Sequence, residues 1–256
     1  MKSLHHNLFS IVVITIVSVS LISCKSQYKI TNMNATIIPM DSTYDKSPDL
    51  PMLLLVNSYK GDLDKEMNVV IGESAEYMTY KRPESLLTNL TSDVMKKYGD
   101  EFLENGADIA LMNVHGHRAS LPKGALTIGN LYEIYSFDNA ITFLELKGSD
   151  LRRVFDAYAR IGGAGISGNV RLVIKDKKVV DLMIDGRPLD ESDTYIIVTL
   201  DYLADGNDNM QALKDAVKRL NTGVTLRDIM IDYIKEQTLQ GNQITSKLDG
   251  RITIIE

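Results

Sequence analysis

The chain has 256 residues, of which 44% are hydrophobic and 24% are charged, and it carries a formal net charge of −6. This length and composition are typical of a globular protein with one large domain or two small ones, so we expect a packed core. The acidic balance and the lack of any block of lysines and arginines argue against a nucleic-acid partner, because binding through counterion release needs a basic surface.

The first 24 residues predict an export signal with a lipid anchor. Lys2 precedes an apolar run from about Leu8 to Leu21, which has the length of a secretory hydrophobic region and is short for a membrane span. The run ends in Leu-Ile-Ser-Cys24, which resembles the lipobox of bacterial lipoproteins, where the cysteine is lipidated and becomes the mature N-terminus. Cys24 is the only cysteine of the chain, which excludes an intramolecular disulfide and a zinc site built from cysteines. We expect residues 1–23 to be a signal peptide and the protein to be anchored in the bacterial cell envelope, on the periplasmic side or at the cell surface; a signal peptide with an incidental cysteine is the alternative.

The residues after the cysteine predict a tether and then the start of a domain. Residues 24–48 are polar, apart from a β-favouring piece at 35–38 that can add one edge strand. Pro51 opens an apolar run with helical spacing, and proline is favoured in the first turn of a helix. We therefore place the domain at 49–256.

Two elements are predicted before the centre of the domain. Residues 67–72 alternate in polarity as a strand does. Beyond them, apolar residues from Leu86 to Met95 recur at helical spacing, which predicts an amphipathic helix that starts after Pro83 and ends by Gly99.

The stretch at 107–119 carries the first candidate site. Its apolar run at 109–112 predicts a buried strand, and the strand is followed by a polar loop that contains Asn113, Gly116 and Arg118. A carboxamide, a flexible backbone position and a guanidinium within six residues can together bind one small polar ligand. A plain connection with a surface arginine is the alternative from spacing alone.

The rest of the chain mixes helices with hairpins. This order favours an α+β fold with a mixed sheet and packed helices over a doubly wound fold. The expected elements are strands at 141–146, 195–200 and 251–255, helices at 148–158 and 225–233, a hairpin of 170–174 with 179–184, and a turn-rich polar loop at 201–208.

Five motifs in order resemble the C-terminal, substrate-binding domain of the 5′-nucleotidase family, from about Lys81 to the end of the chain. The family's Asn-Gly-Gly-Gly-Ile-Arg corresponds to Asn113-Val-His-Gly-His-Arg118, and its Phe-Leu-Ala-x-Gly-Gly-Asp corresponds to Tyr202-Leu-Ala-Asp-Gly-Asn-Asp208. The other matching segments are Gly129-Asn-Leu-Tyr-Glu133 with Ser136-Phe137, Leu146 to Arg152, and Gly186-Arg-Pro-Leu-Asp190.

The resemblance implies a role for each matching residue. Phe137 and Tyr202 stand where the family's two aromatics sandwich the nucleobase, and Asp208 stands where an aspartate accepts hydrogen bonds from the ribose. Asn113 and Arg118, with the intervening Gly116, would hold the nucleoside and its phosphate side. Arg82 matches a further arginine of the family, although Pro83 can shift this alignment by one residue.

Three positions depart from the family pattern. His115 and His117 replace small or apolar residues, and we expect them to hydrogen-bond the ligand or each other rather than to bind a metal ion, which needs more ligands. Asn207 replaces a glycine, and asparagine tolerates the left-handed backbone conformation better than most residues.

The family's catalytic metal motifs are missing from these 256 residues. Full-length members hydrolyse phosphate esters with an N-terminal dimetal domain, whose Asp-x-His, Asn-His and Gly-His-x-His motifs supply ligands. The resemblance thus implies a nucleotide-recognition domain without its own metal cofactor, acting with a separately encoded metallophosphatase that carries the divalent metals. A stand-alone nucleoside- or nucleotide-binding envelope lipoprotein without hydrolytic activity is the alternative, and a degenerate domain kept for an envelope interaction is a third. Whether the chain counts as an enzyme stays open at this point.

Cys24→Ser is expected to release the protein from the membrane. Two or more acyl chains on the cysteine are needed for stable attachment, and serine accepts none through this route. Detergent-phase partitioning of the variant and the parent checks this, and equal partitioning would contradict lipidation at Cys24.

Overall fold

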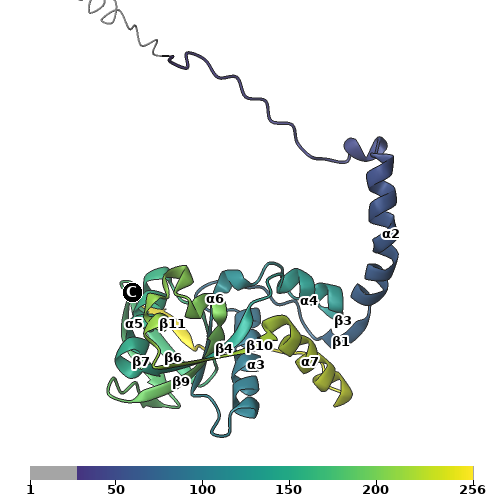
Figure 1. Cartoon of the computed structure of the whole chain (residues 1–256). Coiled ribbons are helices and arrows are strands. Elements are labelled where there is room, and N and C mark those ends of the chain that lie inside the picture. The colour runs from purple at the N-terminus through teal and green to yellow at the C-terminus, as the bar shows by residue number, and fades with distance from the viewer. Residues whose placement is uncertain (1–27, 256) are drawn as a thin grey trace, which may run out of the picture. The chain divides into compact units, whose positions relative to one another are not determined.

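A computed structural model describes residues 28–255 (Figure 1). The chain divides into two units, with the boundary between Leu53 and Leu54. In the first unit, residues 28–43 form no helix or strand, and a 3-10 turn η1 follows at Tyr44–Lys46. The edge strand predicted at 35–38 is therefore wrong, because no other strand lies beside it to accept its backbone hydrogen bonds.

The predicted helix at Pro51 forms as α2, Leu50–Met67. Its side chains remain largely in solvent, and the exposed ones include Leu54, Leu55 and Tyr59. Among the described residues, no helix has both the length and the hydropathy that crossing a bilayer requires.

The described part of the second unit contains three sheets and, after α2, three helices of 14 residues or more. Helices pack against the central sheet and a smaller sheet, and the mixed sheets with packed helices are those of an α+β fold. Their bounds are β1 Val70–Ser74, α3 Leu86–Phe102, β2 Ile109–Met112, η2 Val114–Gly116, β3 Gly124–Thr127, α4 Ile128–Ile134, β4 Ala140–Lys147, α5 Gly148–Ile161, β5 Gly165–Ile166, β6 Val170–Lys175, β7 Lys178–Ile184, β8 Arg187–Pro188, β9 Thr194–Leu200, α6 Asp201–Ala204, η3 Asn207–Asn209, η4 Gln211–Asp215, β10 Lys218–Thr225, α7 Leu226–Leu239 and β11 Ile252–Ile255.

The central sheet has five strands in the order β10-β4-β9-β2-β5. β9 lies in its middle, antiparallel to β4 and parallel to β2, as its β-branched, apolar sequence predicts. The mixed sheet expected from the sequence is therefore confirmed.

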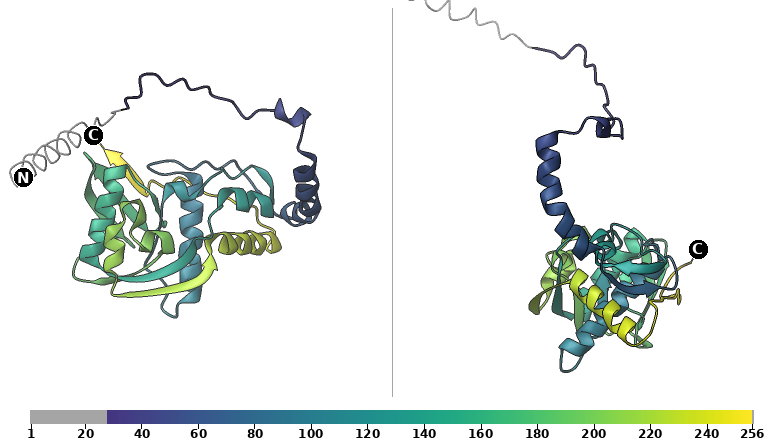
Figure 2. Two further views of the ribbon diagram at one scale, coloured as in Figure 1. Left: turned by 45° about the horizontal axis from the view of Figure 1, so that its top comes forward. Right: turned by 90° about the vertical axis from the view of Figure 1, so that its right-hand side faces the viewer.

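Two smaller sheets flank the central one. β1 pairs with β3, and the four-stranded sheet has the order β11-β6-β7-β8, in which β11 runs parallel to β6. In both Figure 1 and the left view of Figure 2, β11, an edge strand of this sheet, and α7 lie at opposite ends of the unit. The predicted hairpin of 170–174 with 179–184 is confirmed as β6 and β7.

Several predicted boundaries differ from the observed ones. α3 continues through Gly99 and ends at Phe102, so the predicted end at Gly99 is wrong. Gly99 is needed for close packing, because a Cβ there would lie 2.5 Å from Val198 Cγ2. The predicted loop at 201–208 contains the short helices α6 and η3, and α7 runs to Leu239, beyond the predicted end at 233. β10 was not predicted, because its sequence is polar and its side chains are largely exposed.

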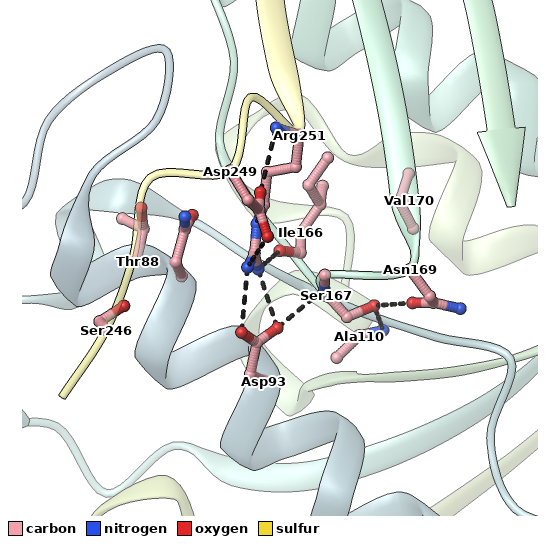
Figure 3. A network of polar contacts seen from close by, with 12 residues as sticks. Thr88, Asp93, Ala110, Ile166, Ser167, Asn169, Val170, Ser246, Asp249 and Arg251 are labelled. Atoms are coloured by element: carbon pink, nitrogen blue, oxygen red, sulfur yellow. Dashed lines mark hydrogen bonds and ion pairs between the residues drawn. The ribbon is translucent and has the colours of Figure 1, made fainter. Parts of the chain in front are cut away.

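A buried arginine joins the end of the chain to the core (Figure 3). Arg251 is 1% exposed, and its guanidinium donates two hydrogen bonds to Asp93 on α3, at 2.8 and 3.0 Å. It also donates to both carboxylate oxygens of Asp249 and to the carbonyl of Ile166 on β5. A buried charge needs such partners, and here it links three elements that lie far apart in the sequence.

Replacement of Arg251 by methionine is expected to lower the free energy of unfolding by about 3 kcal/mol, because two carboxylates and a carbonyl then lose their donor. Urea denaturation measures this difference. The same change at Arg187, which is exposed on β8, is the matched control and is expected to stay within about 0.5 kcal/mol of the parent. Equal midpoints for the two variants would contradict the assigned role.

Candidate functional site

Three neighbouring strands of the central sheet meet the cavity at the same end of the sheet. The parallel strands β2 and β9 end there at Met112 and Leu200, and the antiparallel β4 begins there at Ala140. Loops at the carboxyl ends of parallel strands commonly form binding sites, because the sheet holds the loops at fixed distances. Here these loops enclose a cavity of about 350 Å³. Its lining residues are Asn113, His115, Gly116, Arg118, Phe137, Asn139, Tyr202 and Asp208.

A chain of hydrogen bonds crosses the cavity from β2 to the segment after β9. Asn113 Nδ2 donates to one carboxylate oxygen of Asp208 at 2.6 Å, and the Tyr202 hydroxyl donates to the other at 3.0 Å. The bond to the carboxylate raises the pKa of the Tyr202 hydroxyl above its ordinary value. Each carboxylate oxygen keeps a free lone pair, so Asp208 can still accept hydrogen bonds from a ligand.

The amide of Asn113 also presents an unused acceptor. Its Oδ1 is buried and has no hydrogen-bond partner within the described residues. The glycine at position 116 leaves room for this oxygen, because a Cβ on residue 116 would lie 2.7 Å from Asn113 Oδ1. A buried acceptor without a partner is costly, and a ligand donor would satisfy it.

An aromatic wall and an arginine form the other side of the cavity. Phe137 is 50% exposed and Tyr202 is 39% exposed, so both rings are accessible to a ligand in the cavity. The guanidinium of Arg118 lies over the Phe137 ring, 5.6 Å from its centroid.

The first turn of α7 fixes the loop that carries Phe137. Arg227 Nη1 donates to the carbonyl of Tyr135 at 2.8 Å, and its Nη2 pairs with Asp138. The same guanidinium stacks on Tyr132, 4.0 Å from the ring centroid. The loop is therefore held on both sides of Phe137.

The structure brings together most of the residues predicted for the site. Six of them line the cavity, and Arg82 lies next to it, where its Nη1 contacts His115 Nε2 at 3.1 Å. Cys24 lies outside the described residues. His115, which was expected to contact the ligand or His117, also lines the cavity. The prediction missed Asn139, which belongs to no motif and whose only signal is its place between Phe137 and a strand.

Three expectations about individual residues are corrected. Asn207 is not in the left-handed conformation; Asp208 and Asn209 adopt it, with φ of 53° and 65°, while Asn207 Nδ2 donates to the Tyr202 carbonyl. The two histidines do not bond each other, because His117 points into the core. Stacking alone predicts that the Tyr202 hydroxyl is dispensable, but that hydroxyl donates a hydrogen bond to Asp208, so we expect its removal to have an effect.

Comparison with known proteins identifies the family. The sequence profile described as "5′-nucleotidase, C-terminal domain" matches residues 69–215, more than half of the chain. The chain belongs to the 5′-nucleotidase C-terminal domain family.

Individual relatives of this 5′-nucleotidase C-terminal domain are longer than the present chain. Protein UshA of Yersinia enterocolitica is 27% identical over 241 residues, which cover 91% of this chain and 43% of that protein. Endonuclease YhcR of Bacillus subtilis is 29% identical over 91% of this chain and 19% of its own length. The crystal structure of a 5′-nucleotidase precursor from Thermus thermophilus superposes with a TM-score of 0.71 at 28% identity, over 81% of this chain and 44% of that one. The chain thus spans less than half of each relative.

A buried histidine supports the site loop of this 5′-nucleotidase C-terminal domain from below. His117 Nδ1 lies 3.1 Å from the Val114 carbonyl, which can only accept, so the proton is on Nδ1. Its Nε2 lies 2.9 Å from Thr91 Oγ1 on α3, and its ring stacks on Tyr80. Burial lowers the pKa of His117 to about 4, against the weaker opposing effect of the Val114 carbonyl.

The pKa of His117 predicts a loss of stability in acid. The unfolded chain binds the proton near pH 6.5 and the folded chain only near pH 4, so the contribution is present above pH 6.5 and lost as the pH falls through 4. Relative to His117→Gln, the parent is expected to lose about 3 kcal/mol of unfolding free energy over this range. Urea denaturation at pH 7 and pH 4 measures it. Equal losses in the parent and in His117→Gln would contradict the assignment.

Proposed function

We propose that this chain is the nucleotide-recognition domain of a 5′-nucleotidase-type hydrolase of nucleotide catabolism and acts with a separately encoded metallophosphatase. The observation that carries this proposal is the position of Asp208. Its carboxylate lies in the cavity, held by Asn113 and Tyr202 and with free lone pairs, as recognition of a vicinal diol requires. In this proposal the diol is that of a ribose.

The half-exposed aromatics supply the base-binding part of the proposed site. Stacking of a base on an aromatic ring is worth about 1 to 3 kcal/mol and needs no particular base. Phe137 is held by the Arg227 clamp, and Tyr202 is held through its hydroxyl, so both rings are fixed before a ligand arrives. Binding to a pre-ordered site loses less conformational entropy.

The proposed phosphate side is formed by arginines without a carboxylate partner. Within the described residues, Arg82 donates to the Gly163 carbonyl at 2.9 Å and contacts His115, while Arg118 lies over Phe137; neither forms an ion pair. A guanidinium in this state can bind a phosphate through two parallel hydrogen bonds.

The chemical step in this proposal belongs to the partner. Hydrolysis of a phosphate monoester at neutral pH needs a metal-activated water, and no group of three or more histidine, cysteine, aspartate or glutamate residues suited to a metal ion occurs in residues 28–255. The divalent metals would therefore lie on the metallophosphatase. We further propose that the chain is exported and lipid-anchored at Cys24, which would place both proteins in the cell envelope.

Loss of either ring is expected to weaken ligand binding. Phe137→Ala and Tyr202→Ala should each lower the affinity for adenosine and AMP about five- to a hundredfold, since each removes one stacking face. Tyr202→Phe keeps the ring but loses the hydrogen bond to Asp208, and should cost about two- to tenfold. Isothermal titration with a check of melting temperatures measures these effects.

The matched control is Tyr77→Ala, an exposed tyrosine away from the cavity, which should leave affinity unchanged. A phosphate-release assay then separates the two candidate functions. Nucleotide binding with hydrolysis only after a metallophosphatase is added supports the proposal. Binding without hydrolysis in any combination supports the stand-alone binding lipoprotein, and no binding of adenosine or AMP by the parent at millimolar concentration refutes both.

A further inference from the structure

One exposed residue of the cavity is not explained by the roles assigned so far. His115 stands where the family motif Asn-Gly-Gly-Gly-Ile-Arg has a glycine, and its side chain lines the cavity beside Arg118 and Asp208. The imidazole therefore occupies space that a glycine would leave open. Its contact with Arg82, and the presence of Arg118 in the same cavity, make it a candidate for direct contact with an anionic ligand.

The geometry defines the state of His115 in the structure. Its Nε2 lies 3.1 Å from Nη1 of Arg82, and a guanidinium can only donate. Nε2 is therefore the acceptor, so the imidazole is neutral and carries its proton on Nδ1. A protonated imidazole has no acceptor left, and it would place a second positive charge against Arg82.

The charges around His115 come from several elements. Arg82 precedes α3, Arg118 follows η2, and Asp208 in η3 is the only carboxylate among the cavity residues. Both oxygens of Asp208 already accept hydrogen bonds from Asn113 and Tyr202, so this charge is partly satisfied. An anion bound between the two arginines would be the natural counterion of a charged His115.

We propose that His115 is a specificity-determining residue that favours ligands with a 5′ anionic group over nucleosides, and that this preference increases as the pH falls. The inference rests on the proposed function. When neutral, His115 accepts from Arg82 and adds no charge; when protonated, it donates a charge-assisted hydrogen bond to the ligand's anionic group. Protonation and anion binding are thermodynamically linked, because the bound anion favours the charged imidazole and the charged imidazole favours the anion.

The test uses a ligand whose own charge is constant. Adenosine 5′-sulfate keeps one negative charge from pH 5.5 to 8.0, whereas AMP changes charge within that range. The measured quantity is the ratio of the Kd of adenosine to the Kd of adenosine 5′-sulfate, obtained by isothermal titration of the full chain at both pH values. The ratio is expected to rise about tenfold in the parent as the pH falls from 8.0 to 5.5.

Two variants isolate the contribution of His115. In His115→Gln the amide can still accept from Arg82 but cannot become charged, so its ratio should be independent of pH. In His115→Lys the charge is permanent, so the ratio should be high at both pH values. His117 stays neutral at pH 5.5, because its pKa is lowered to about 4, so it does not contribute to the change in the Kd ratio.

The outcomes separate the inference from the proposed function. Adenosine binding with the same pH-independent ratio in the parent and in His115→Gln overturns the inference and leaves the proposed function standing. Failure of the parent to bind adenosine at all overturns both. A rise in the parent that is absent in His115→Gln and replaced by a constant high ratio in His115→Lys supports the inference.

Discussion

The buried guanidinium of Arg251 is the contact on which the arrangement of the second unit depends. It lies in the core, where an unpaired charge would be very costly, so Asp93 of α3 and Asp249 must stay beside it. The same Asp93 accepts from the backbone of Gly168, directly after Ser167, whose own backbone and side chain bond Ala110 on β2. This network therefore fixes α3 against the strand that ends at the cavity. The ion pair of Arg251 and Asp93 thus helps to position the strand that leads into the Asn113 loop.

The cavity itself depends on polar contacts between segments that are remote in sequence. Asn113 and Asp208 are 95 residues apart, and Arg227 reaches back to Tyr135 across 92 residues. The first bond joins two walls of the cavity, and the second holds the loop of Phe137 to α7. The central sheet supplies the common frame, because β9 and β2 end and β4 begins at the same end of the sheet, and these strands cannot shift separately without breaking their hydrogen-bond ladders.

Periodicity predicted the elements whose side chains divide cleanly between core and solvent. β9 and the hairpin of β6 and β7 were found in this way, as was the start of α3, where Ser85 forms a capping box with Thr88. Gly99 was wrongly predicted to end the helix. A glycine is needed there because residues distant in sequence pack closely against it, and a local sequence pattern does not show such contacts. The motifs located most cavity residues, but not the Tyr202 hydroxyl bond or the place of Asn139. Those depend on which loops meet in space, and a single sequence does not carry that information.

One glycine limits how this chain can change over evolutionary time. Gly163 has φ of 99°, and a Cβ there would lie 2.8 Å from the carbonyl oxygen of Pro83. Its own carbonyl accepts from Arg82, the neighbour of that proline. A single added methyl would thus move the segment that carries the arginine, although residue 163 lies at the far end of α5. Sequence drift in the loop after α5 and drift in the segment before α3 are therefore coupled, and a variant library should find position 163 as intolerant as any residue of the core.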